Sequence, residues 1–310
     1  MRQELLRWDH VNYHESGIVL LDDFSLNIFK GEIVGFIPVN DHGLSAFLHL
    51  LRINAPLEDG YIYYKEVLVN SWKKAEKELN RICIISDESS LIDDLSVADN
   101  IFIFRPNARI RIIDSSLLIK QLQPFLDDIH VSILAEARIK DLSVFERVIV
   151  EILKAVVGGY QLIVLSEIST LVSDAELSKL REIMRHYIRQ GFSFLYISPH
   201  FEEMFQVCSS IALMLNGRIE KVFRKEEMKA DLLLSFTTAY DELVRQRFER
   251  KRDFSMDSAH VFEVQSETPD FLCGLSFSVA KGECLVIQAL DKRIDDEILN
   301  TYYGENISKK

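Results

Sequence analysis

Short apolar runs alternate with longer amphipathic stretches through the first two thirds of the chain. The apolar runs are typical of buried strands, and the stretches between them carry apolar residues at helical spacing. The expected strands are residues 31–37, 81–86, 161–166 and 192–198, and the expected helices are residues 44–53, 145–158, 174–191 and 201–208. Strands that alternate with helices favour an α/β fold around a largely parallel sheet.

The pattern differs at both ends of this region. Residues 5–28 read as antiparallel strands that cap the sheet, and residues 210–223 read as a hairpin with Asn-Gly at its turn. Residues 224–258 are polar and read as a connector, helical in part, with a basic cluster. The cluster consists of Arg245, Arg247, Arg250, Lys251 and Arg252. It is either a solvated helix face or a docking surface for an acidic partner.

A partial repeat follows the connector. Residues 260–290 echo residues 6–39: each copy gives a strand, a turn, Lys-Gly-Glu and then an apolar strand. The expected organisation is one full module at 1–223, the connector at 224–258, and a truncated second module at 259–310. A shortened product that is losing its function is a further interpretation, although the apolar periodicity of the first module is intact.

Composition and charge exclude several classes of function. The formal net charge is -12 over 310 residues, which disfavours general binding to nucleic acid or to anionic membranes. The chain has no apolar run of membrane-spanning length and no apolar signal segment at its beginning, so we expect a cytoplasmic protein. Four cysteines lack Cys-x-x-Cys spacing, so we expect no zinc site and no disulfide, with Cys83 and Cys284 as small core residues.

Several segments together resemble the ATP-binding subunits of ABC transporters, in particular the tandem type that serves sugar import. The matching segments keep the family's order and spacing at residues 85–103, 141–156, 162–184 and 194–219. The resemblance implies a P-loop NTPase-like ABC ATPase fold. That fold has a mainly parallel sheet flanked by helices, an antiparallel β subdomain and a helical subdomain, here with a partial second module.

The phosphate loop departs from the pattern G-x-x-x-x-G-K-[ST], whose lysine and hydroxyl contact phosphate and magnesium. Pro38 occupies the first glycine position and Leu44 the lysine position, while Gly43 and Ser45 are kept. Asp41 replaces a glycine and adds a carboxylate. The resemblance assigns nucleotide-binding positions to Asn40, Gly43, Leu44, Ser45, Asp87, Ser143 and Ser166.

The remaining motifs are altered as well. The Walker B pair is Ser166-Glu167, which keeps the base position without the metal-side carboxylate. The signature reads Leu-Ser-Val-Phe-Glu at 142–146, with Ser143 kept. Asp87 stands at the Q-loop glutamine position, and Pro199 stands at the switch histidine position with His200 next to it. The adenine-stacking position is Glu15, with Tyr13 nearby, and the second copy has Asp295 and Asp296 near its lysine and hydroxyl positions.

Losses at so many nucleotide contacts, with the core pattern intact, favour a non-hydrolysing protein that regulates or binds another protein. Expected partners are a sugar-importer permease, an intact ABC ATPase paralogue or a sensor protein, with a dimer as a further form and membrane contact only through a permease. Glu167 is then a relic or a hydrogen-bonding group, and His200 would be catalytic only if a one-residue shift brought it to the switch position. No cofactor or metal is expected.

The alternative is a working ATPase subunit of a carbohydrate importer that binds ATP and Mg²⁺ with atypical residues. Docking of a permease is expected in the helical subdomain, at about 87–140. Its apolar residues are either part of a docking groove or simply core: Ile101, Phe102, Ile103, Leu117, Leu118, Leu122 and Leu126.

Overall fold

The computed structural model describes residues 2–73, 75, 80–102, 115–227, 260–264 and 277–285. The chain divides into two compact units, Met1–Asp241 and Glu242–Lys310, which we describe separately. The basic cluster at 245–252 and the altered phosphate loop of the second copy at 288–299 lie outside the described residues.

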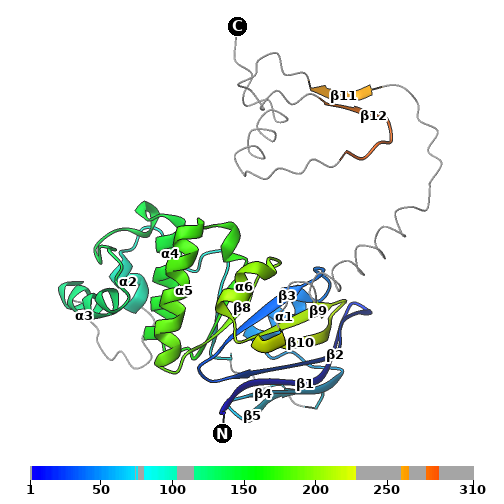
Figure 1. Ribbon diagram of the computed structural model, residues 1–310, viewed down its shortest axis with the longest axis horizontal. Helices are drawn as coiled ribbons and strands as arrows, with labels where there is room; N and C mark the ends of the chain where they lie inside the picture. Colours follow the sequence, from blue (N-terminus) through cyan, green and yellow to red (C-terminus); the bar gives the residue numbers. More distant parts are fainter. Residues whose placement is uncertain are drawn as a thin grey trace. The chain divides into compact units, whose positions relative to one another are not determined.

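The first unit is built on a six-stranded sheet (Figure 1). Its strand order is β10-β9-β3-β8-β7-β6, and every neighbouring pair is parallel except β9 and β10. The strands are β3 (Ile33–Pro38), β6 (Ile82–Ile85), β7 (Leu162–Ser166), β8 (Ser193–Ile197), β9 (Ser210–Leu215) and β10 (Arg218–Arg224). The parallel α/β arrangement predicted from the apolar runs is confirmed, as is the hairpin with Asn-Gly at its turn.

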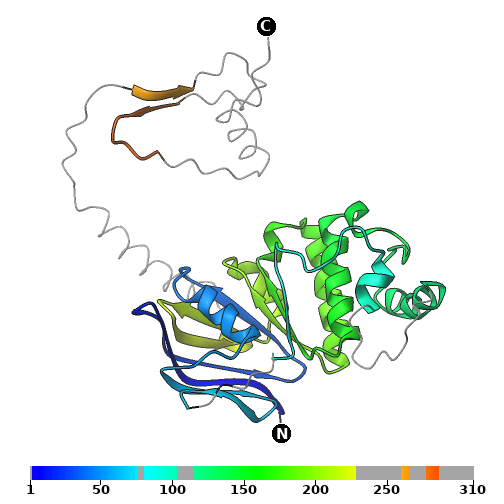
Figure 2. The same ribbon diagram turned by 180° about the vertical axis from the view of Figure 1, so that it is seen from behind.

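A second sheet of four antiparallel strands, in the order β2-β1-β4-β5, forms the cap predicted for the opening residues. Its strands are β1 (Glu4–Glu15), β2 (Ile18–Phe29), β4 (Asp59–Tyr64) and β5 (Val67–Ser71). Register shifts interrupt the β1–β2 ladder at several points. Helix α1 (Leu44–Arg52) packs with the strands of both sheets in one apolar core (Figure 2).

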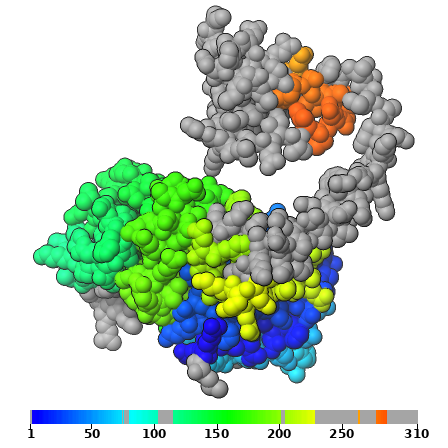
Figure 3. Space-filling view, viewed as in Figure 1, coloured from blue at the N-terminus to red at the C-terminus, as the bar shows by residue number. Residues whose placement is uncertain are grey.

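The other helices gather on the opposite face of the six-stranded sheet and at one end of the unit. They are α2 (Val97–Phe102), α3 (Ser115–Asp128), α4 (Val144–Val157), α5 (Asp174–Arg189) and α6 (Phe201–Val207), with short 3-10 turns at Ile139–Asp141, Ile168–Thr170 and Lys225–Glu227. Figure 3 shows α2 and α3 at the end of this unit opposite the N-terminal strands. Helices α4 and α5 begin with Ser-x-x-Glu capping boxes, which fixes where each helix starts.

Strand alternation explains how one sheet supports two cores. In β7, Ile163 and Leu165 belong to the core under α4 and α5, whereas Leu162 and Val164 belong to the core shared with α1 and the antiparallel sheet. All four side chains are fully buried. A strand that is covered on both faces reads as a continuous apolar run, which is why the sequence located β7 and β8 well.

The described part of the second unit is a small antiparallel pair, β11 (His260–Val264) and β12 (Phe277–Ala280). The expectation that Cys284 is a small core residue was wrong, because its side chain is exposed. Residues 281–285 form a turn followed by irregular backbone, so the expected strand does not start there. Cys83 is partly buried, and Cys208 is buried.

Candidate functional site

The predicted motifs follow strands that end at one edge of the six-stranded sheet. Because β3, β6, β7 and β8 are parallel, their carboxyl ends meet at this edge, where ligands bind in open α/β sheets. Ser166 pairs with Ile197 in the sheet, and the backbone N–H of Glu167 donates to the Ile197 carbonyl at 2.9 Å. The fold therefore brings the Walker B position next to the switch strand.

The loop after β3 is tied to the β9–β10 turn. The side chains of Asn40 and Asn216 make one contact at 2.8 Å, and the Asn216 backbone N–H donates to the Asn40 amide oxygen at 3.1 Å. Gly43 has φ +84°, and a Cβ added there would lie 2.3 Å from the Leu20 carbonyl oxygen. Glycine is therefore required at position 43 because the loop presses on β2, whatever ligand it meets.

Leu44 is the first residue of α1, and its side chain points into protein. It is 8% exposed and belongs to the core shared by α1 and the antiparallel sheet. Ser45, the next residue, is exposed and lines a cavity of about 700 Å³. Leu44 therefore lies in the core and Ser45 at the cavity, although the phosphate-loop pattern places both residues beside the same ligand.

This nucleotide-position cavity has acidic and aromatic walls. It is lined by Tyr13, Glu15, Leu20, Asp41, His42, Gly43, Ser45, Ala46 and His49. None of these lining residues is Lys or Arg. Burial, assisted by the Glu15 charge, raises the pKa of the Tyr13 hydroxyl. The His42 ring donates from Nε2 to the Val19 carbonyl at 2.8 Å. A triphosphate placed here would meet carboxylates without a compensating lysine or arginine, so the lining does not fit Mg-ATP.

The residues at the hydrolysis positions are held mainly by their backbones. Ser166 is buried, whereas Glu167 is exposed with φ +57°. The Glu167 carbonyl accepts from the Thr170 hydroxyl at 2.8 Å, which fixes the turn after β7. His200 is exposed just before α6, and its backbone N–H donates to the Ser198 hydroxyl at 3.1 Å. The predicted roles of Glu167 and His200 remain predictions.

Ser143 caps helix α4. Its hydroxyl accepts from the Glu146 backbone N–H at 3.2 Å, and the Glu146 carboxylate accepts from the Ser143 backbone N–H at 2.8 Å. Both side chains are therefore engaged within the chain. Glu146, the last residue of the altered signature, therefore has a structural partner within its own helix.

Asp87 lines a different cavity, of about 350 Å³, between the loop after β6 and the start of α4. The walls include Ser86, Leu142, Val144, Val148 and Leu171, with Arg147 and Glu151. Val144 is 50% exposed, so one apolar wall of this cavity is open to solvent. Sequence reasoning missed Glu151, whose signal was one acidic residue inside the apolar stripe of a helix.

The apolar residues of the helical subdomain are mostly core. Ile101, Phe102, Leu122 and Leu126 are at most 5% exposed, Leu118 is partly buried and packs against the same core, and Leu117 is 45% exposed. Ile103 lies outside the described residues. The buried residues cannot form a docking surface, so the alternative that they are core is correct for them.

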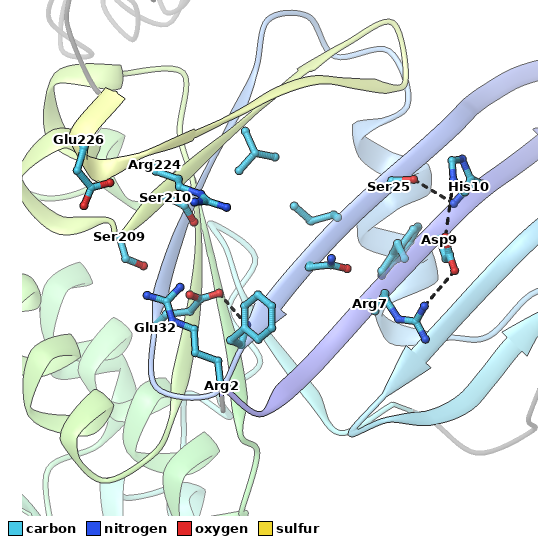
Figure 4. A pocket seen from close by; sticks show the side chains of 15 residues that line it. Arg2, Arg7, Asp9, His10, Ser25, Glu32, Ser209, Ser210, Arg224 and Glu226 are labelled. Atoms are coloured by element: carbon cyan, nitrogen blue, oxygen red, sulfur yellow. Dashed lines mark hydrogen bonds and ion pairs between the residues drawn. The ribbon is translucent and has the colours of Figure 1, made fainter.

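A cavity of about 920 Å³ contains none of the predicted site residues (Figure 4). Arg2, Glu32 and Arg224 gather at one side of it, and Arg7, Asp9 and His10 at the other (Figure 4). Glu32 accepts from the Phe29 backbone N–H at 2.7 Å, and burial raises the pKa of its carboxyl. The charged residues that line this cavity carry both signs, so they do not favour one class of ligand.

Two properties of the described residues concern metal binding and membrane crossing. No group of three or more His, Cys, Asp or Glu side chains there is arranged to hold a metal ion. None of the described helices combines the length and apolar character needed to cross a bilayer.

The family described as ABC transporter matches residues 21–170, from β2 to the turn after β7. Similar curated proteins include the ribose import ATP-binding protein RbsA of Clostridium perfringens, 26% identical over 98% of this chain and 60% of its own length. The xylose import ATP-binding protein XylG of Geobacillus kaustophilus is 25% identical over 100% of this chain and 62% of its own length. The chain thus spans about 60% of the length of the curated relatives it matches.

Solved structures agree on the fold. The ADP conformation of MJ1267, an ATP-binding cassette of an ABC transporter, superposes with a TM-score of 0.61 at 18% identity, over 72% of this chain and 92% of that chain. CbiO1 from Clostridium perfringens, part of the ABC transporter complex cbiONQ, gives 0.62 at 16% identity over 80% and 96%. Residues 21–170 thus match the ABC transporter family model, and the first unit has the fold of these ATP-binding cassettes.

Proposed function

We propose that this chain is a non-hydrolysing relative of carbohydrate-importer ATP-binding subunits that acts by binding another protein. The relatives named above are import proteins for ribose and xylose, which supports the carbohydrate-importer class. The expected partner is a permease, an intact ATPase paralogue or a sensor protein. A permease would hold the chain at the cytoplasmic face of the membrane, and pairing with a second cassette would give a dimer.

One observation carries the proposal: the residue at the lysine position, Leu44, is buried in the core, while Asp41 and Glu15 line the cavity beside it. The positive charge that the family's lysine supplies is therefore absent, and the Leu44 side chain points away from the cavity. A like-charge pair at ~4 Å costs roughly 4 kcal/mol at an effective dielectric near 20, and less where the carboxylates are exposed to water. The positive end of α1 offers only about half a charge in compensation.

The surface that supports protein binding lies around the 350 Å³ cavity. It combines apolar walls, which include the half-exposed Val144, with the carboxylate of Asp87. An apolar depression with a polar rim is typical of a protein interaction site. This cavity does not depend on the residues of the nucleotide-position cavity, so the chain can lose ATP and keep a partner.

A working ATPase remains the second candidate. Ser45 lines the nucleotide-position cavity, Gly43 keeps a left-handed conformation, and Glu167 is exposed at the end of β7. In this case ATP and Mg²⁺ would bind with atypical residues, and Glu167 would polarise the attacking water. Leu44 and Pro38 argue against this function.

Thermal unfolding with and without millimolar Mg-ATP separates the two functions. A ligand at 100 times its Kd stabilises a protein by roughly 2.7 kcal/mol, which raises Tm by a few degrees. We expect no shift and no phosphate release. A shift that Ser45→Ala removes, with phosphate release that Glu167→Gln abolishes, would establish the ATPase instead. Mg-ADP and ATP without magnesium serve as controls for ionic effects on Tm.

A further inference from the structure

The turn between β9 and β10 consists of Asn216 and Gly217, and its packing requires glycine at the second position. Both residues have positive φ, 51° and 76°, as in the type I′ hairpin turns that Asn-Gly favours. A Cβ added at Gly217 would lie 2.0 Å from the Leu20 carbonyl oxygen on β2. The residue after Asn216 can therefore carry no side chain.

An asparagine followed by glycine has a particular chemical reactivity. The glycine backbone nitrogen can attack the asparagine Cγ, because no Cβ hinders its approach. The new C–N bond closes a succinimide ring, and the side-chain nitrogen leaves as ammonia with the proton that the backbone nitrogen gave to water. A water molecule then adds across one of the two ring C–N bonds and opens the ring. One product is aspartate, and the other is isoaspartate, whose backbone runs through the side-chain carbon.

The surroundings of Asn216 favour the first of these steps. Its Oδ1 accepts from Asn40 Nδ2 at 2.8 Å, and such a donor stabilises the negative charge that develops on a carbonyl oxygen under attack. Asn216 is exposed, so water reaches its side chain. Within the described ranges, no hydrogen bond occupies the Gly217 N–H or the Asn216 Nδ2. The attacking nitrogen and the leaving group are both unrestrained there, while the carbonyl between them is polarised.

We propose that Asn216 is a site of spontaneous deamidation in the folded protein, and that the isoaspartate it forms loosens the loop after β3. Gly43 of that loop packs against the same carbonyl oxygen as Gly217: a Cβ at Gly43 would lie 2.3 Å from the Leu20 oxygen and 3.0 Å from the Gly217 Cα. Isoaspartate adds one backbone carbon to the turn, so the turn cannot keep both this packing and the contact with Asn40. Modification therefore changes the wall of the nucleotide-position cavity, which Leu20 and Gly43 line.

Peptide mapping by mass spectrometry tests the site on the full folded chain, incubated at neutral pH and physiological temperature. We expect the peptide that contains Asn216 to acquire the mass of the acid with time, and part of it to resist cleavage by Asp-N protease, as isoaspartate does. The rate should rise with pH, because the attacking nitrogen must lose its proton. The Tm of the aged protein should fall by a few degrees. Fresh Asn216→Asp, which has the charge on an ordinary backbone, should retain most of the original Tm.

A second asparagine with a small neighbour, Asn70-Ser71 on β5, is the comparison within the same chain. Asn70 is fully buried, its Nδ2 donates to the Ala55 carbonyl at 2.8 Å, and no described group donates to its Oδ1. We expect no conversion at Asn70. Asn40→Asp removes the donor to Asn216 Oδ1 and keeps an acceptor for the Asn216 N–H, so it should slow conversion at position 216 several-fold. Near-ultraviolet circular dichroism verifies that this variant is folded.

Conversion at Asn216 only in urea-unfolded chain overturns the proposal, because the turn would then protect the residue. Equal rates in the original chain and in folded Asn40→Asp also overturn it, since the reactivity would not depend on the structure. An unchanged Tm after conversion would overturn the effect on the loop. The inference does not rest on the proposed function: binding of Mg-ATP would overturn that function and leave the chemistry at Asn216 as it is.

Discussion

At the residue scale, the proposed loss of ATP hydrolysis depends most on Leu44. It stands at the lysine position of the phosphate loop, and it has become part of the hydrophobic core. Fully burying a leucine side chain contributes roughly 1.5–3 kcal/mol. The substitution therefore does two things at once: it removes a phosphate contact, and it supplies apolar surface to the packing of α1.

Leu44→Lys tests whether the lysine alone restores function. We expect no ATP turnover, because Asp41 and the altered residues Pro38, Ser166 and Pro199 remain. We also expect a loss of about 2 kcal/mol or more in the free energy of unfolding, since a charge would replace a buried apolar side chain. Phosphate release and chemical denaturation of the purified variant measure the two effects.

Ser45→Lys is the matched control, since it places the same charge on the neighbouring exposed residue. Its effect on unfolding should be within about 0.5 kcal/mol, as for most surface substitutions. Appreciable hydrolysis by Leu44→Lys would show that the other losses do not matter and would contradict the non-hydrolysing function.

The sequence predicted the missing charge at position 44, but it did not predict the burial of that side chain. The sequence shows which chemical groups are present. The direction of the Leu44 side chain, however, depends on how the loop after β3 packs against β2 and the β9–β10 turn. Glu151 escaped notice for a related reason. A single acidic residue in an apolar stripe reads as a solvated helix position until the structure shows a loop covering it.

At the element scale, α4 and α5 begin in the same way. Ser143 and Glu146 form a capping box on α4, and Ser173 and Glu176 form one on α5. The match explains Ser143 without any role in phosphate binding. A hydroxyl that caps its own helix is a sufficient physical reason for serine at that position.

Ser143→Ala and Ser173→Ala should therefore behave alike. Each should lower the free energy of unfolding by about 1 kcal/mol, which is the usual effect of removing a serine N-cap. Ser143→Thr should keep most of the stability, because threonine also caps helices. Urea titration followed by circular dichroism gives both values. If Ser143→Ala also changed the Tm response to Mg-ATP and Ser173→Ala did not, the serine at 143 would have a signature role after all.

The elements were more predictable than the site, for reasons visible in particular strands. β7 and β8 are buried on both faces, so their apolar runs stand out. β1 and β2 are long and irregular, and their register shifts hide the simple alternation of a half-buried strand. The start of the second copy repeats the pattern of the first, yet residues 281–285 are not a strand, because local pattern does not provide the neighbouring strands that a sheet needs.

At the scale of the whole molecule, the first unit depends on a sheet with a core on each face. Val164 lies in the middle of this arrangement: it sits on β7 between β6 and β8 and is fully buried against the core that contains α1. Because both sheets contribute to that core, a packing defect in β7 also disturbs the packing of the antiparallel sheet. Total stabilities of folded domains are about 5–15 kcal/mol, so one severe defect can unfold the unit.

Val164→Asp should prevent folding of the first unit, because an unpaired buried carboxylate costs several kcal/mol in addition to the lost packing. Val222→Asp is the control: it makes the same change on β10, the edge strand, where the side chain is 43% exposed. We expect Val222→Asp to remain soluble with a cooperative transition, and Val164→Asp to lose its near-ultraviolet circular dichroism. A folded, cooperative Val164→Asp would mean that the two cores are not joined through β7, and the account of this unit as one sheet with two dependent faces would fail.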